Sequence, residues 1–155
     1  MIRNAIENLI RWKNDEDRKP LILRGARQVG KTWLMKEFGK KYYKNYAYFN
    51  FDEEVEIKSV FETNKNPKRI IELLSLVNGE KIVPGESLII LDEIQECSDA
   101  LNSLKYFKEN ANEYHVIVAG SLLGTFLAGP KSYPVGMVNI LDIYPLVFGE
   151  FLEAT

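Results

Sequence analysis

The stretch LRGARQVGKTWL, residues 23–34, carries residue types suited to holding a chain of phosphates. Gly25, Gly30, Lys31 and Thr32 match the pattern G-x-x-x-x-G-K-[ST]. Glycines let backbone N–H groups approach phosphate oxygens, a lysine ammonium can bridge the outer phosphates, and a threonine hydroxyl is suited to magnesium. The pattern therefore predicts a phosphate-binding loop. The residues expected to form it are Gly25, Ala26, Arg27, Gln28, Val29, Gly30, Lys31, Thr32 and Trp33.

Two other interpretations of this stretch are weaker. An ordinary glycine-rich turn would leave Lys31 merely solvated, but the pattern is rare by chance and lies between a predicted strand and a predicted helix, as the motif requires. A dinucleotide-binding fingerprint needs a glycine where the sequence has Arg27, whose side chain would obstruct a pyrophosphate. Arg27 and Gln28 could themselves contact phosphate or a partner, and Arg27 could equally pair with Asp92 or Glu93.

A second group of polar residues follows the apolar run in LIILDEIQ, residues 88–95. Asp92 ends this predicted buried strand, where α/β sheets place their ligands, and it can hold a magnesium-bound water. Glu93 could orient and polarise an attacking water. The alternative is that both acids cap a helix or face solvent, which the presence of the phosphate loop disfavours. Gln95 could couple this site to a neighbour or be an ordinary polar loop residue.

Ser121, Cys97 and His115 are three further residues of types that can take part in chemistry. Ser121 ends the apolar run VIVAGS and could hydrogen-bond a γ-phosphate or water, or satisfy nearby backbone groups. Cys97 has no matching base motif, and His115 opens an apolar strand, so we expect neither to be catalytic. They are the only cysteine and histidine, which excludes a disulfide framework and a zinc cluster of these residue types.

The elements that must position these residues alternate between strand and helix. Such alternation predicts an α/β layered fold with a mostly parallel sheet of about five strands. Asn66 and Pro67 are expected to start one helix, Gly39 to end another, and Ser98 and Asp99 to cap a third. The expected elements are a leading helix at 2–10, strands at 21–25, 46–52, 87–92, 115–121 and 138–144, the last two buried, and helices at 30–38, 67–78 and about 100–107.

The composition indicates one folded domain. The 155 residues carry a formal charge of −2, which gives no broad basic field for nucleic acid and leaves only a local basic patch as a means of binding it. The first 20 residues space their apolar side chains as a helix does, unlike a secretion signal. No apolar stretch reaches the roughly 18 residues of a membrane span. We therefore expect a cytoplasmic protein that does not span a membrane.

The chain resembles the prokaryotic AAA-like P-loop ATPases that carry an uncharacterised, nuclease-like C-terminal domain. The resemblance covers nearly the whole length and rests on LILRGARQVGKTWLMKEF, LIILDEIQE, LKYF, VIVAGSLLG and DIYPLVFGEFL, in that order. It implies a three-layer P-loop NTPase fold of the additional-strand type, with the sensor strand between the phosphate-loop strand and the acidic-pair strand. It also implies that ATP and Mg²⁺ are bound, and that Ser121 is the sensor residue, between Lys31 and Asp92.

Two departures from the family pattern affect the expected activity. No arginine follows Arg69, so an arginine finger beyond the sensor strand has no candidate, and Lys131 is the only basic residue after Ser121. The family's C-terminal domain is not in these 155 residues. We therefore expect residues 1–155 to be the P-loop ATPase core of a longer protein, with residues 1–19 as a leading helix and linker, and hydrolysis by this fragment to be weak.

The predicted function is Mg²⁺-dependent ATP hydrolysis, with Thr32 and Asp92 at the metal and Lys31, Glu93 and Ser121 as catalytic residues. The alternative is a nucleotide-gated module that binds protein or DNA with negligible turnover. A DNA or protein partner would act through the C-terminal region, and oligomerisation is compatible with the sequence. A small-molecule kinase is disfavoured because the acidic pair suits water as nucleophile. A GTPase is disfavoured because NKNP, residues 64–67, lacks the aspartate of N-K-x-D.

Overall fold

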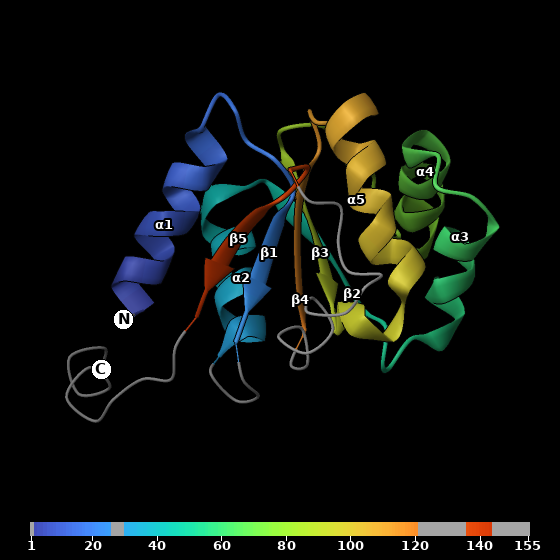
Figure 1. The fold of residues 1–155 in the computed structure, drawn as a ribbon, viewed down its shortest axis with the longest axis horizontal. Coiled ribbons are helices and arrows are strands. Elements are labelled where there is room, and N and C mark those ends of the chain that lie inside the picture. The colour runs from blue at the N-terminus through green and yellow to red at the C-terminus, as the bar shows by residue number, and fades with distance from the viewer. Residues whose placement is uncertain (1, 26–29, 121–135, 144–155) are drawn as a thin grey trace.

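The computed structural model describes residues 2–25, 30–120 and 136–143 of the chain. They form three layers, with a five-stranded sheet between two layers of helices (Figure 1). None of the helices in these ranges is long and apolar enough to cross a membrane. The strands are β1 Leu21–Arg24, β2 Asn45–Asn50, β3 Ser87–Asp92, β4 His115–Gly120 and β5 Asn139–Asp142. The helices are α1 Ile2–Asn14, α2 Lys31–Tyr42, α3 Lys58–Thr63, α4 Pro67–Asn78 and α5 Ser98–Asn110, with short 3-10 turns at Val55–Ile57 and Ile94–Glu96.

The sheet has the order β2-β3-β4-β1-β5, and every neighbouring pair is parallel. The prediction of a mostly parallel, five-stranded α/β fold is therefore confirmed. β4 lies between β1 and β3, which is the arrangement that the family resemblance implied. All six residues of β3 and all six of β4 are buried, because helices cover both faces of these central strands.

The prediction that the last strand is buried is wrong. Burial alternates along β5 between intermediate and exposed residues, and Ile140 is 36% exposed. β5 pairs with β1 and stands at the end of the strand order, so it is an edge strand. An apolar run such as VNIL therefore does not by itself distinguish a central strand from an edge strand.

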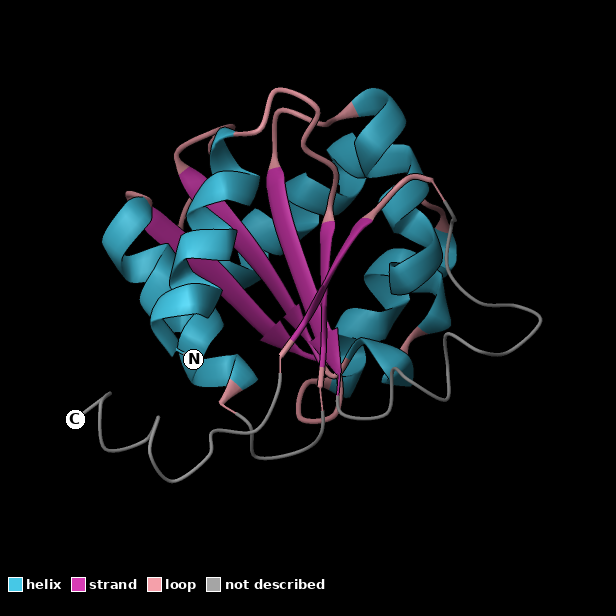
Figure 2. Ribbon diagram, turned by 60° about the vertical axis from the view of Figure 1, so that its left-hand side comes forward, coloured by secondary structure: helices cyan, strands magenta, loops and turns pink. Residues whose placement is uncertain are grey.

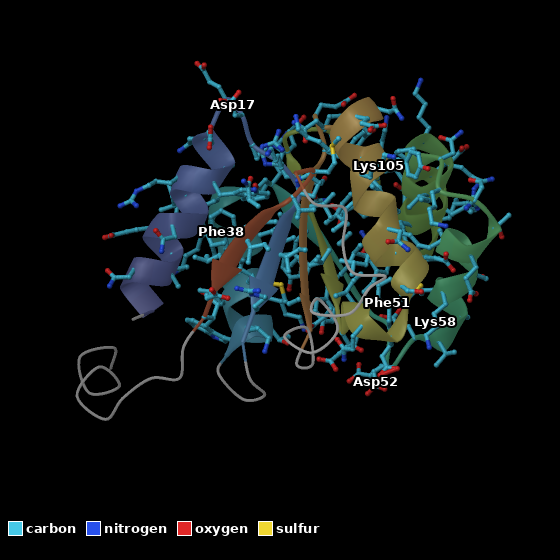
Figure 3. The ribbon with its side chains drawn as sticks, in the orientation of Figure 1. Asp17, Phe38, Phe51, Asp52, Lys58 and Lys105 are labelled. Carbon is cyan, nitrogen blue, oxygen red and sulfur yellow. The ribbon has the colours of Figure 1, made fainter. Side chains whose placement is uncertain are left out.

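Two hydrophobic clusters lie on opposite faces of the sheet. One includes Leu9 of α1 and Phe38 of α2, and the other includes Phe61 of α3 and Phe107 of α5. Figure 3 shows Phe38 on the side of α1 and α2, and Phe51 on the side of α3 and α5. Successive strand residues point to opposite faces, so β1, β2, β3 and β4 each have side chains in or packed against both clusters.

Gly39 does not end its helix as expected. α2 continues to Tyr42, with Lys40 and Lys41 in the last turn. A Cβ atom added at Gly39 would lie 2.8 Å from the Cβ of Tyr46 in β2, closer than side chains tolerate. The glycine is therefore explained by close packing of the helix on the sheet, and a terminator role is not needed.

The other helix boundaries give mixed results. The side chain of Asn66 accepts a hydrogen bond from the Lys68 backbone N–H at 3.0 Å, as predicted. Helix α4 ends at the expected residue Asn78 and is followed by Gly79 with φ 75°. At α5 the residue before the helix is Cys97, and no side chain caps it. Asp99 instead forms an ion pair of 2.9 Å with Lys65.

The 3-10 turn Val55–Ile57 and helix α3 were not predicted from the sequence. Their buried residues Ile57 and Phe61 belong to the cluster that α5 also enters. A helix of six residues is too short to show a helical repeat of apolar positions, so its formation depends on these tertiary contacts.

Candidate functional site

The predicted phosphate loop and acidic pair lie at one edge of the sheet. Because the strands are parallel, all five carboxyl ends reach this edge (Figure 2). Arg24 at the end of β1 is in register with Gly120 at the end of β4, and Asn50 of β2 with Asp92 of β3. In Figure 3, Asp52 marks this carboxyl edge, and Asp17 lies at the opposite edge.

Gly30 and Lys31 form the junction between the loop and α2. Gly30 precedes the helix with φ 87°, a conformation that favours glycine, while a Cβ there would meet nothing within 4 Å. The backbone angle, and not lack of space, therefore explains this glycine. Lys31 is only 7% exposed, and its Nζ donates a 2.7 Å hydrogen bond to the carbonyl oxygen of Gly25. The ammonium group thus bends back over the start of the loop.

Thr32 and Asp92 meet at the sheet edge. The Thr32 hydroxyl donates a 2.5 Å hydrogen bond to Oδ2 of Asp92, which is 3% exposed. Burial of a carboxylate is costly unless it is paired or hydrogen-bonded, so this contact helps to hold Asp92 in place. Thr32 itself is exposed at the first turn of α2, and a ligand can reach it from solvent.

Tyr48 of β2 is a member of this site that the sequence analysis missed. Its hydroxyl donates a 2.7 Å hydrogen bond to the same Oδ2 atom of Asp92, and accepts one of 3.3 Å from the side chain of Asn50. Burial, followed by the hydrogen bond to Asp92, raises the pKa of Tyr48 above its ordinary value. Tyr48 therefore stays protonated as a donor at neutral pH. The aromatic stretch YAYFNFD, residues 46–52, predicted a strand but did not indicate which strand would lie beside it.

Glu93 has an unusual backbone conformation, with φ 54° and ψ 47° in the left-handed region. Among the residues that the structure describes, it is the only non-glycine with positive φ. Its backbone N–H donates a 2.9 Å hydrogen bond to Oδ1 of Asp92. Such conformations cost free energy and often occur at functional sites. The turn directs the chain away from the strand immediately after Asp92.

Gln95 contacts the predicted catalytic carboxylate. Its Nε2 donates a 3.0 Å hydrogen bond to Oε2 of Glu93, and its buried Oε1 has no hydrogen-bond partner in the described part of the chain. Gln95 therefore lies beside Glu93 in the candidate site, and its coupling to a neighbour stays a prediction.

Residues 17–152 match a protein-family model described as an AAA domain. The chain belongs to this AAA domain family. No curated protein sequence matches it significantly. The family establishes a P-loop ATPase type of domain, for which nucleotide binding is expected.

Several solved structures share the fold of this AAA domain. The Walker-type ATPase PABY2304 of Pyrococcus abyssi is 20% identical with a TM-score of 0.60, over 98% of this chain and 54% of that one. The Aeropyrum pernix Orc1 protein, solved with DNA, is 16% identical with a TM-score of 0.57, over 98% and 46%. The Pif1 helicase from Bacteroides, solved with ADP-AlF3 and single-stranded DNA, is 16% identical with a TM-score of 0.52, over 95% and 43%. The AAA domain thus spans about half the length of these proteins.

The oxygen ligands in the AAA domain fit a nucleotide-bound magnesium ion. Mg²⁺ takes oxygen ligands and commonly uses one or two from protein, with the remainder from water and phosphate. The hydroxyl of Thr32 and the carboxylate of Asp92 provide such oxygens within one hydrogen bond of each other. Within residues 2–25, 30–120 and 136–143, no group of three or more His, Cys, Asp or Glu could hold a metal ion.

Arg24 forms a contact of the AAA domain that the sequence did not suggest. Its guanidinium makes two hydrogen bonds to the carboxylate of Asp142, of 2.7 and 3.0 Å. This pairing joins the ends of β1 and β5 directly before the phosphate loop. The hydrogen bond to Arg24 lowers the pKa of Asp142.

Some predicted site residues have no described position. Ala26, Arg27, Gln28, Val29 and Ser121 lie outside the residues that the structure describes. The described loop residues are Gly25 and those from Gly30 onward, including Trp33, whose side chain is 54% exposed next to the loop.

His115 and Trp12 lie in the core. The Tyr43 hydroxyl and Nδ1 of His115 share a 2.7 Å hydrogen bond, and burial lowers the pKa of His115 to about 4. Trp12 is buried as well. Its indole N–H donates to the carbonyl of Lys19, and its ring packs against His115. β4 begins at His115, at the opposite edge from Asp92.

Proposed function

We propose that this AAA domain binds ATP with Mg²⁺ and hydrolyses the β–γ phosphoanhydride. One observation carries the proposal. Lys31, Thr32 and Asp92, from two separate motifs, lie together at the carboxyl edge of the sheet, and the Thr32 hydroxyl donates a hydrogen bond to Asp92. This proximity supports the proposed roles of the lysine ammonium at the phosphates and of the Thr32 and Asp92 oxygens at the metal.

Each residue has a separate role in this proposal. Backbone N–H groups of the loop and the start of α2 bind the phosphates, and Lys31 balances charge on the outer two. Thr32 and Asp92 hold the magnesium ion, which when bound neutralises charge that develops on the phosphate oxygens. Ser121 is proposed to hydrogen-bond the γ-phosphate.

Glu93 is proposed to orient the attacking water and accept its proton. The water oxygen forms a bond to the γ-phosphorus while the bond from that phosphorus to the β–γ bridging oxygen breaks, and ADP leaves with the bridging oxygen. The left-handed turn places Glu93 directly beside Asp92, whose Oδ1 accepts the backbone N–H of Glu93. Little covalent assistance is needed, because catalysis of this reaction depends mainly on positioning and charge.

The same domain is proposed to be the N-terminal core of a larger AAA-like ATPase. The solved structures that share the fold are about twice as long as the chain. In the larger protein, a nuclease-like C-terminal domain would supply contacts to a DNA or protein partner, and an arginine donated by another subunit would complete the site. ATP hydrolysis by residues 1–155 alone is expected to be slow.

Two substitutions test the proposed ATPase. Lys31→Ala removes a charge-assisted contact to phosphate, and we expect ATP to bind about 100-fold more weakly or not at all. Glu93→Gln should retain ATP affinity and lose turnover. Lys40→Ala, an exposed lysine in the last turn of the same helix, is the matched control and should behave as wild type. Equal ATP affinity in Lys31→Ala and wild type would refute the proposal.

A nucleotide-gated interaction module is the second candidate. The hydrogen bond from Gln95 to Glu93 favours it, because it engages a carboxylate that hydrolysis would require. Single-turnover measurements with and without DNA discriminate between the two functions. Protein that binds ATP and retains it under all conditions would support the module, whereas turnover that DNA or a partner accelerates would support the ATPase.

A further inference from the structure

We propose that Tyr48 is a positioning residue that sets the Asp92 carboxylate for magnesium-bound nucleotide. This inference rests on the proposed function, since it concerns the same metal site. Tyr48 belongs to neither motif that predicted the site. It comes from β2, the edge strand beside β3, and reaches the carboxylate from the side opposite to β4 in the strand order.

Three donors fix the orientation of Asp92. The Thr32 hydroxyl and the Tyr48 hydroxyl donate to Oδ2 at 2.5 and 2.7 Å, and the Glu93 backbone N–H donates to Oδ1 at 2.9 Å. Both carboxylate oxygens are therefore engaged, and rotation about the bond to the carboxylate would break at least one of these contacts. A metal ligand held in this way loses little conformational freedom when the ion binds.

The contributions of Thr32 and Tyr48 differ in one respect. In the proposed function the Thr32 oxygen also binds the metal, so its contact with Asp92 depends on the state of the site. Tyr48 donates a hydrogen bond to Asp92 but is not itself a proposed metal ligand. It therefore provides a hydrogen bond to Oδ2 that is present before nucleotide arrives.

Lys36 holds the ring of Tyr48 in place. Its Nζ lies 4.0 Å from the centroid of the ring, within the range of a cation–π contact. Lys36 is one helical turn after Thr32 in α2, so both residues lie on the same face of the helix. Helix α2 thus contacts Asp92 directly through Thr32 and indirectly through Lys36 and Tyr48.

The decisive variant is Tyr48→Phe, which keeps the ring and removes the hydroxyl. ATP affinity is measured in excess EDTA and again in excess Mg²⁺. The ratio of the two affinities is the gain in ATP affinity due to Mg²⁺, called below the gain due to Mg²⁺. We expect affinity in EDTA to change by less than about twofold and the gain due to Mg²⁺ to fall about tenfold, as for loss of a hydrogen bond to a charged group.

Tyr46→Phe is the matched control. Tyr46 lies two residues earlier on the same face of β2, with its Cβ beside Gly39, and makes no described hydrogen bond to Asp92. Its gain due to Mg²⁺ should equal that of wild type. In Asp92→Asn, adding Tyr48→Phe should cause no further loss, because the two residues act through one carboxylate. Thermal unfolding without nucleotide reports whether each variant is folded.

The outcomes separate this inference from the proposed function. If wild type fails to bind ATP with or without Mg²⁺, the proposed function fails. If wild type shows a gain due to Mg²⁺ and Tyr48→Phe shows the same gain, the inference about Tyr48 is wrong and the proposed function stands. Equal weakening of Tyr48→Phe in EDTA and in Mg²⁺ would also overturn the inference, since it indicates a general structural role.

Lys36→Met provides a second test should Tyr48→Phe not fold. It leaves the Tyr48 hydroxyl intact and removes the cation above the ring. We expect the gain due to Mg²⁺ to fall by about two- to fivefold, in keeping with the modest strength of a cation–π contact. A gain identical to that of wild type would overturn the inference.

Discussion

The Nε2 atom of Gln95 lies 3.0 Å from Oε2 of Glu93 and donates a hydrogen bond to it. The two residues belong to one short turn after β3, in which Glu93 adopts a left-handed backbone conformation. A carboxylate that accepts a hydrogen bond is less free to reorient, and it must give up that bond before the same oxygen can bind water. The contact therefore bears on how readily Glu93 could activate water.

Gln95→Ala is expected to raise the rate of ATP turnover by up to about tenfold at saturating ATP, because Glu93 no longer has to give up this hydrogen bond. The rate of phosphate release measures the effect. Glu96→Ala, an exposed neighbour, serves as control and should leave the rate unchanged. A tenfold decrease in Gln95→Ala would instead show that Gln95 aligns Glu93 for catalysis.

Trp33 should report on the phosphate loop. It is 54% exposed, next to Thr32, while the other tryptophan, Trp12, is buried at the opposite edge of the sheet. Adding ATP with Mg²⁺ should therefore change tryptophan fluorescence through Trp33. The change should disappear in Trp33→Phe and in Lys31→Ala. A full change remaining in Trp33→Phe would place the responding group elsewhere.

Gly39→Ala should destabilise the domain by about 1–3 kcal/mol, despite the higher helix propensity of alanine. The new Cβ would lie 2.8 Å from the Cβ of Tyr46, so α2 and β2 would have to move apart. Denaturant unfolding measures the loss. Gly79→Ala should also destabilise, but through its positive φ and without a contact. Stabilisation by Gly39→Ala would contradict the close packing of α2 on β2.

His115 should make the domain less stable in acid. Burial lowers its folded pKa to about 4, whereas the unfolded pKa is near 6.5, so the unfolded chain binds the proton more strongly. No stability is lost above pH 6.5, where both states are neutral. As pH falls from 6.5 to 4, the free energy of unfolding should decrease by on the order of 3 kcal/mol.

His115→Gln tests this assignment. The variant removes the titrating ring and leaves an amide that can bond to Tyr43. We expect a less stable protein at pH 7.5, because ring contacts with Trp12 and Tyr43 are lost. The dependence of unfolding free energy on pH between 6.5 and 4 should become shallower. An unchanged slope would mean that other groups, such as carboxylates, account for it.

The sequence by itself determined the parts of this protein that depend on neighbouring residues in the chain. The Gly30-Lys31-Thr32 junction, the buried β3 and the caps of α4 at Asn66 and Gly79 follow from local backbone geometry and hydrogen bonding, which residue types within a few positions decide. The strand and helix alternation likewise predicted the α/β class and the parallel sheet.

Only the tertiary structure decided which strands are neighbours, and several functional contacts depend on that order. Tyr48 reaches Asp92 because β2 lies beside β3, and Arg24 reaches Asp142 because β5 lies beside β1. Likewise, the reason for a glycine at position 39 is the close approach of Tyr46 from β2. These partners are 7 to 118 residues apart in the chain. No local pattern could specify them, because strand order results from packing of the helices on both faces of the sheet.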